Sequence, residues 1–171
     1  QVQAGGTNGA MSGGFTITIE APPPGPNMVY GTTGSDTLTG SAGADVISGI
    51  PATGTSLGRG TRDSLNGLGG PDVFVLGDAR GVFYNDGSYW NSGSGDYALI
   101  LDFADGVDKI QVASSRGAHF ASSTNVTLNG VTGKAIYWDS DGNGRYNSRD
   151  EVIGLVAGPS VTIDASDFLF V

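Results

Sequence analysis

The fold of this chain is decided by residues 31–75, which read GTTGSDTLT, GSAGADVIS, GIPATGTSL, GRGTRDSLN and GLGGPDVFV in successive blocks of nine. Every block begins with a glycine: Gly31, Gly40, Gly49, Gly58 and Gly67. Four of the five blocks have aspartate at the sixth position, and four have a large apolar residue at the eighth. This fixed period predicts a stack of short repeats that share one core.

Each block is expected to begin with a tight turn and to end in a short strand. The first six residues form the turn because glycine adopts backbone conformations closed to other residues. Two blocks would make one full coil, so that carbonyl oxygens and carboxylates of stacked turns enclose a gap lined only with oxygen. Such a gap suits Ca²⁺ better than a transition metal. The expected ligand residues are Asp36, Asp45, Asp63 and Asp72, with the fourth-position glycines Gly34, Gly43 and Gly70.

The third block, residues 49–57, departs from the pattern. It has glycine in place of the aspartate and serine in place of the core residue, which predicts a looped-out coil that keeps the count of nine. Pairing every second block predicts that turn 40–45 stacks on turn 58–63 and forms the best site. Turns 31–36 and 67–72 would both meet the degenerate turn and form weaker sites.

The blocks are similar to the G-G-x-G-x-D-x-U-x repeat of the RTX (haemolysin-type) calcium-binding family. The resemblance implies an all-β fold, a short parallel β-roll of nonapeptide calcium repeats capped by an antiparallel, β-sandwich-like C-terminal part. It implies several bound Ca²⁺ ions and a bacterial protein that is secreted or lies at the cell surface. The end of the chain, residues 167–171, resembles the C-terminal signal of type I secretion substrates; it also fits a final strand.

Residues 97–171 are interpreted as the cap of the roll, so that the second region of the chain is 31–171. Residues 97–103 and 107–112 are predicted to be strands around an Asp105–Gly106 turn. The stretch LILDFADGVDKIQV within them is similar to the segment that follows the repeats in RTX proteases. Further short strands are predicted at 125–128, 134–138, 151–156 and 160–163.

A second candidate calcium site lies in residues 139–150, DSDGNGRYNSRD. It resembles an EF-hand loop, or its dockerin-type variant, except that strands are expected on both sides instead of helices. The alternative is a hairpin loop without an ion. The predicted ligands are the side chains of Asp139, Asp141, Asn143, Asn147 and Asp150 and the carbonyl of Arg145.

Residues 1–30 are interpreted as an N-terminal arm or linker with one strand, at 15–19, followed by a proline-rich spacer. A lone strand must find a partner. One hypothesis is strand exchange between copies of the chain into a homo-oligomer or filament. The alternative is an interdomain linker or a strand that docks on its own domain.

The connection 78–96 is rich in aspartate and aromatic residues. Tyr84, Tyr89 and Trp90 could stack on sugars, which would make a cell-surface polysaccharide a partner, or they could pin the connection to the body. Asp78, Asp86 and Asp96 are candidates for a further ion site.

Composition excludes several classes of function. The chain of 171 residues has a formal net charge of −9 and only 8 lysines and arginines, which argues against nucleic-acid binding. It has no cysteine, no apolar run of membrane-spanning length, and a single histidine, His119, with no motif around it. We therefore predict that it is not an enzyme. The sequence favours a secreted calcium-binding structural, matrix or adhesion protein that folds on binding Ca²⁺. The alternative is the non-catalytic C-terminal module of a larger secreted enzyme.

Overall fold

The computed structural model describes residues 25–87, 93–114 and 118–171. Regular structure in these residues consists of strands and one 3₁₀ helix, η1 (Ala165–Asp167), so that the all-β prediction is confirmed. None of the described segments forms a helix that could span a membrane.

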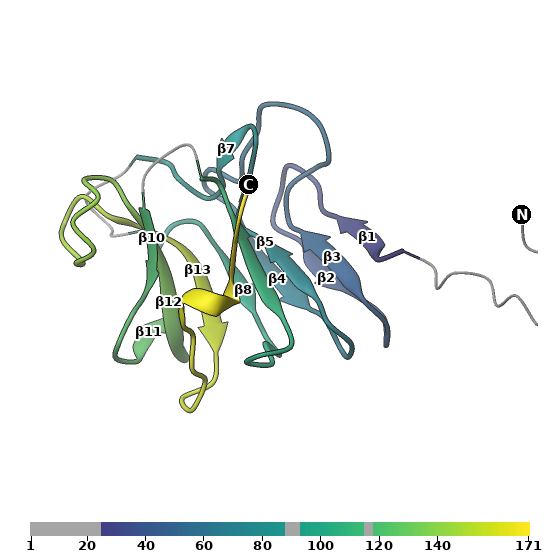
Figure 1. Ribbon diagram of the computed structural model, residues 1–171. Helices are drawn as coiled ribbons and strands as arrows, with labels where there is room; N and C mark the ends of the chain where they lie inside the picture. Colours follow the sequence, from purple (N-terminus) through teal and green to yellow (C-terminus); the bar gives the residue numbers. More distant parts are fainter. Residues whose placement is uncertain (1–24, 88–92, 115–117) are drawn as a thin grey trace, which may run out of the picture.

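Two main sheets face each other across one core (Figure 1). All neighbours in the first sheet are parallel. In spatial order its strands are β1 (Asn27–Tyr30), β3 (Asp45–Ser48), β5 (Val73–Val75), β9 (Lys109–Val112) and β14 (Phe168–Phe170). The second sheet contains β2 (Thr37–Thr39), β4 (Arg62–Asn66), β8 (Tyr97–Ile100), β13 (Glu151–Ala157), β12 (Val131–Asp139) and β10 (Ala118–Ala121), with β11 (Val126–Leu128) against β12. A small third sheet pairs β6 (Gly77–Asp78) with β7 (Gly81–Val82).

The chain alternates between the two sheets from β1 to β5, which is the predicted parallel β-roll. The eighth residue of each regular block lies in register with its counterpart in the next coil. One column of paired residues runs Val29, Ile47, Phe74, Ile110 and Phe168, and the facing column runs Leu38, Leu65 and Ile100. The central members are fully buried. Burying each such side chain contributes about 1.5–3 kcal/mol, which makes these columns the main apolar support of the roll.

The third block is an insertion in one turn of the roll. Val29 pairs with Ile47, 18 residues later, whereas Leu38 pairs with Leu65, 27 residues later. The additional nine residues equal one block. The insertion is held in place by Ile50, which is buried, and by Arg80, whose Nη1 donates to the Pro51 carbonyl at 2.9 Å.

The roll is longer than the repeats indicate. The strands predicted on either side of the Asp105–Gly106 turn are present as β8 and β9, but they do not pair with each other, because they lie in opposite sheets and each adds a parallel strand to a roll sheet. The segment between them crosses from one sheet to the other, as the repeat turns do. At the other end, β1 pairs with β3, so residues 27–30 belong to the roll and not to the arm.

The cap continues the second sheet. β13 joins β8 in parallel, and β12, β10 and β11 add antiparallel strands at the end far from β1 (Figure 1). The strand predicted at 160–163 is absent; this segment is turn and irregular chain that leads to η1 and β14. The arm strand predicted at 15–19 lies outside the described residues.

Candidate metal centre

In each regular turn, the aspartate carboxylate folds back over the first glycine. In turn 40–45, the backbone N–H and hydroxyl of Ser41 donate to Oδ2 of Asp45 at 2.7 and 3.0 Å. A Cβ added to Gly40 would lie 2.7 Å from the same oxygen. Equivalent Cβ atoms on Gly31 and Gly67 would meet the carboxylates of Asp36 and Asp72, respectively. Glycine is therefore required at Gly31, Gly40 and Gly67 because a side chain there would occupy the place of the carboxylate.

The insertion preserves this geometry across a longer turn. Gly49 begins the turn after β3, and a Cβ on it would collide with Oδ2 of Asp63. Gly49 and Asp63 are 14 residues apart instead of the usual five, a difference equal to the inserted block. Glycine and aspartate of one turn thus come from the third and fourth blocks.

The predicted pairing of turns is therefore wrong. Turn 40–45 stacks on turn 67–72 and not on turn 58–63, because the backbone N–H of Asp45 donates to Oδ1 of Asp72 at 3.0 Å. Turn 31–36 stacks on the turn that ends at Asp63, because the N–H of Asp36 donates to Oδ1 of Asp63 at 2.8 Å. The degenerate block contributes no turn of its own to either stack.

The turns on one side of the roll form an acidic ladder, which we define as Asn27, Asp45, Asp72 and Asp108. Asn27 caps it by donating through Nδ2 to Oδ1 of Asp45 at 2.7 Å. The N–H of Asp72 donates in turn to Oδ1 of Asp108 at 2.9 Å. The three carboxylates are buried. Asp45 is the first residue of β3, and Asp72 and Asp108 immediately precede β5 and β9, so the three lie one coil apart at the same edge of one sheet.

The pKa values along the ladder differ. Burial opposes ionisation of Asp45, but hydrogen bonds from Ser41 and Asn27 outweigh it and lower its pKa. For Asp72, burial and the charges of Asp108, Asp45 and Asp102 outweigh one backbone hydrogen bond and raise the pKa to about 6. Negative charge is therefore more costly at Asp72 than at Asp45, and a cation beside Asp72 would relieve that cost.

The donor set around Asp72 fits calcium. Within the described part of the chain, Asp72 accepts a hydrogen bond through Oδ1 but not through Oδ2. Its Oδ2 can therefore bind a cation. A Cβ on Gly70 would lie 2.7 Å from the Gly43 carbonyl oxygen, so the turn backbones are in close contact here. The residues that would hold the ion are Asp45 and Asp72 with the turn carbonyls. Of the predicted glycines, Gly43 and Gly70 meet, while Gly34 lies exposed on turn 31–36.

In the second stack of turns, which contains Asp36 and Asp63, the carboxylate of Asp63 is hydrogen-bonded to a tyrosine. Tyr84 is fully buried and its hydroxyl donates to Oδ2 of Asp63 at 2.6 Å. Burial raises the pKa of Asp63, the hydrogen bonds from Tyr84 and Asp36 oppose this change, and the charge of Asp36 adds to it. The interpretation of Tyr84 as a sugar-stacking residue is therefore wrong, and its pinning role is correct. Tyr89 and Trp90 lie outside the described residues.

The loop 139–150 joins β12 to β13 and brings its predicted ligands together. One carboxylate oxygen from each of Asp139, Asp141 and Asp150 lies within 4.8 Å of the other two. Asp139 is buried and accepts from the N–H groups of Gly142 and Gly144 at 2.7 and 2.6 Å. Both glycines have positive φ angles, 69° and 68°, which allow this sharp turn.

The other predicted ligands of this loop lie on its rim. Asn143 accepts through Oδ1 from the N–H of Arg145 at 2.7 Å, and Asn147 donates through Nδ2 to Asp141 at 3.2 Å. Burial raises the pKa of Asp150, hydrogen bonds from Asn147 and Ser140 oppose it, and the charges of Asp139 and Asp141 add to it. The loop is therefore a compact group of oxygen donors with excess negative charge, as a calcium site requires.

Two acidic residues of the roll were missed by sequence reasoning. Asp102 accepts from the N–H groups of Gly67 and Leu68 at 2.9 and 2.7 Å. Asp108 accepts from Asp72 and, through Oδ2, from the N–H of Ala104 at 2.8 Å. A signal for Asp108 was present, because it stands two residues before the buried Ile110, as Asp72 does before Phe74.

The single histidine lies on β10, where burial lowers its pKa to about 4. His119 therefore has a neutral imidazole at pH 7. That the chain is not an enzyme stays a prediction.

The comparisons agree with the geometry of the turns. Residues 24–49 match the family model described as RTX calcium-binding nonapeptide repeat (4 copies). No curated protein matches the chain. Such repeats indicate calcium binding and are typical of secreted proteins. Residues 24–49 therefore carry RTX calcium-binding nonapeptide repeats, in agreement with the first two predicted blocks.

Proposed function

We propose that this chain is a secreted calcium-binding surface or matrix protein whose roll becomes stable when Ca²⁺ binds between its turns. The observation that carries the proposal is the acidic ladder, in which Asp45, Asp72 and Asp108 are buried where three neighbouring parallel strands begin. Without a cation, their mutual repulsion opposes the stacking of coils. With Ca²⁺, the ion bridges turns and its charge compensates the carboxylates.

The linkage between binding and folding follows from mass action. An ion that binds only the folded chain stabilises it by about 2.7 kcal/mol at a hundredfold excess over its Kd. Several ions add such contributions if their sites are independent. Low calcium inside the producing cell would keep the chain unfolded, and high calcium outside would fold it.

The test is urea unfolding of the full chain at a series of free Ca²⁺ concentrations, followed by far-UV circular dichroism. The unfolding midpoint should rise with the logarithm of the Ca²⁺ concentration, and Mg²⁺ at the same concentrations should have a much smaller effect. A midpoint that is the same in excess chelator and in millimolar Ca²⁺ would remove the mechanism.

Open strand edges support a role in assembly. In the described part of the chain, β1 and β2 each pair on one side only, with β3 and β4. An exposed edge accepts another strand by backbone hydrogen bonding. The donor would be residues 15–19 of a neighbouring copy, or a preceding domain if the chain is the module of a larger secreted enzyme. Deleting residues 1–20 should lower the number of chains per particle, as measured by light scattering. An unchanged number of chains per particle would contradict exchange between copies.

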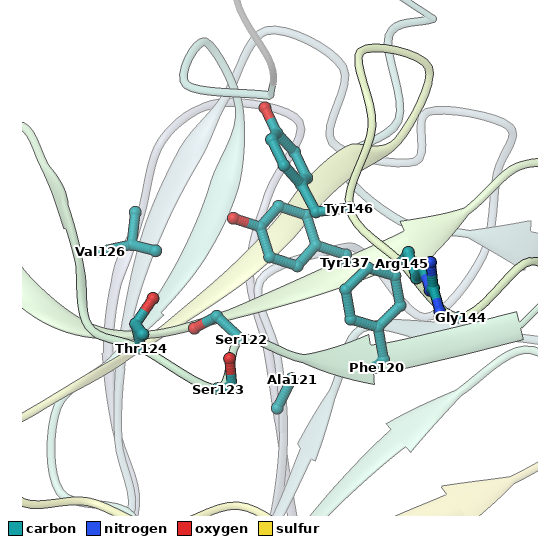
Figure 2. Close-up of a pocket in the computed structure, with 10 residues that line it drawn as sticks. All are labelled: Phe120, Ala121, Ser122, Ser123, Thr124, Val126, Tyr137, Gly144, Arg145 and Tyr146. Carbon is teal, nitrogen blue, oxygen red and sulfur yellow. The ribbon is translucent and has the colours of Figure 1, made fainter.

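A groove in the cap supports adhesion to a polysaccharide. It has a volume of about 550 Å³, and its aromatic side is a row of Tyr146, Tyr137 and Phe120 (Figure 2). The ring centroids are 4.8 Å apart for Tyr146 and Tyr137, and 5.1 Å apart for Phe120 and Tyr137. The hydroxyls of Ser122 and Ser123 line the groove as well. Tyr137 is buried between its neighbours, so the half-exposed ring of Tyr146, with Phe120 and the hydroxyls, is what the groove would offer to the apolar faces and hydroxyl edges of sugars.

Tyr146 connects this groove to calcium, because it belongs to the loop 139–150 and is half exposed. A Tyr146→Ala variant should retain its folding and lose retention on polysaccharide affinity gels, and chelator should weaken wild-type retention. Retention of the variant equal to that of the wild type would contradict this assignment.

A further inference from the structure

Three carboxylates outside the nonapeptide turns converge where the connection 78–96 meets the cap. They belong to Asp86, to Asp96 immediately before β8, and to Glu151 at the start of β13. One oxygen from each lies within 4.8 Å of the others. The connection lies close against β13 here, since a Cβ on Gly93 would collide with the backbone N of Val152.

Two of these carboxylates are buried and incompletely paired. Asp96 is 0% exposed and Glu151 is 2% exposed. Oδ2 of Asp96 accepts from the N–H of Gly60 at 3.1 Å, but within residues 25–87, 93–114 and 118–171 neither Oδ1 of Asp96 nor Oε1 of Glu151 has a hydrogen-bond partner. An unpaired buried carboxylate oxygen is costly, and two such atoms beside a third carboxylate favour the binding of a cation.

The electrostatics of the group agree with this geometry. Burial, with the charges of Asp86 and Asp96, raises the pKa of Glu151 to about 8. Burial and the charge of Asp86 also raise the pKa of Asp96 to about 6, although the Gly60 N–H and the exposed Arg59 oppose this change. Burial and crowding therefore oppose the ionisation of these carboxyl groups, and a bound cation would offset that cost.

We propose that Asp86, Asp96 and Glu151 form a separate Ca²⁺ site that fastens the connection to the cap. Carboxylate oxygens from flexible and rigid elements are the donors that Ca²⁺ prefers. Glu151 follows Asp150, and successive residues of a strand point to opposite faces. The end of the β12–β13 hairpin would then carry two ions. The loop 139–150 would hold one on one face, and Asp86, Asp96 and Glu151 would hold the other on the opposite face. The site does not require the roll turns to bind calcium.

The experiment counts calcium ions bound per full chain by equilibrium dialysis at pH 7. The Asp96→Asn/Glu151→Gln double variant should bind one Ca²⁺ fewer than the wild type. In chelator, with trimethylamine N-oxide added to keep the calcium-free chains folded, it should unfold at a higher urea concentration than the wild type, because the amides remove the cost of burying the carboxyl groups together. The matched control is Asp105→Asn/Asp164→Asn, which changes the net charge equally at exposed positions and should bind as many ions as the wild type.

A second variant keeps the test valid if the double variant does not fold. Asp86 is exposed, so Asp86→Asn should fold normally and weaken the affinity for one ion by about tenfold. The proposal is overturned if folded Asp86→Asn and the double variant both bind as many ions as the wild type with unchanged affinity. Failure of the proposed roll function is a different result, in which Asp72→Asn binds as many ions as the wild type.

Discussion

Replacing Asp72 by asparagine should change the stability of this protein in opposite directions with and without calcium. The asparagine keeps the size of the side chain and an Oδ1 that can accept the N–H of Asp45, and it removes one negative charge from the ladder. The wild-type pKa of about 6, against an ordinary 3.8, measures how strongly burial and the neighbouring carboxylates oppose the charge of Asp72. This difference corresponds to about 3 kcal/mol at pH 7, as an upper limit.

The sign follows from proton linkage. Because the pKa is raised in the calcium-free folded chain, the unfolded chain loses its proton first as the pH rises. The stability of the calcium-free wild type should therefore fall from about pH 4 through about pH 6 and then level off. Asp72→Asn should show a smaller decrease, because only the contribution of Asp72 is removed while Asp96, whose pKa is also raised to about 6, still titrates. In chelator at pH 7 it should be the more stable protein by about 1–3 kcal/mol.

With saturating calcium the order should reverse, since the variant has lost a ligand. Its deficit should approach the linkage contribution of one site, about 2.7 kcal/mol at a hundredfold excess over Kd. The assay is urea unfolding at pH 7 in chelator and in Ca²⁺, with trimethylamine N-oxide added throughout to keep the calcium-free chains folded at zero urea. Asp105→Asn, at an exposed turn, is the control for net charge. Equal destabilisation of Asp72→Asn in both conditions would refute the argument.

Two further predictions concern a glycine and a tyrosine of the turns. Gly67→Ala should destabilise the calcium-bound chain by about 1–3 kcal/mol, because its Cβ collides with the carboxylate of Asp72; Gly69→Ala, which meets no atom within 4 Å, should unfold like the wild type in the same thermal scan. Equal melting temperatures of the two variants would contradict the claim that Gly67 is needed to make room for the carboxylate of Asp72. Tyr84→Phe should cost about 2 kcal/mol by removing the hydroxyl donor to buried Asp63; an unchanged free energy of unfolding in urea would show that the pair contributes nothing.

The sequence predicts the repeat unit well because its constraints are local. A carboxylate that folds over a glycine five residues earlier, and an apolar residue two positions after that aspartate, recur at each coil. The columns of Ile47 with Phe74 and of Leu38 with Leu65 follow from this pattern. The all-β class and the calcium repeats were therefore predictable.

Pairing between turns was not predictable from the period. A count of nine cannot distinguish a stacked coil from an inserted block, so the predicted partner of Asp45 is wrong. The buried Ile50 and the hydrogen bond from Arg80 to Pro51 show why the insertion is tolerated. Glu151 and Asp96 are 55 residues apart, and only the parallel pairing of β13 with β8 brings them together.

Calcium bridging between the stacked turns can be observed by anomalous X-ray scattering from crystals of the full chain grown in Ca²⁺, because this measurement locates the ions themselves. We expect a calcium peak between turns 40–45 and 67–72, coordinated by the carboxylates of Asp45 or Asp72. An ordered roll in millimolar Ca²⁺ with no ion between these turns would contradict calcium bridging.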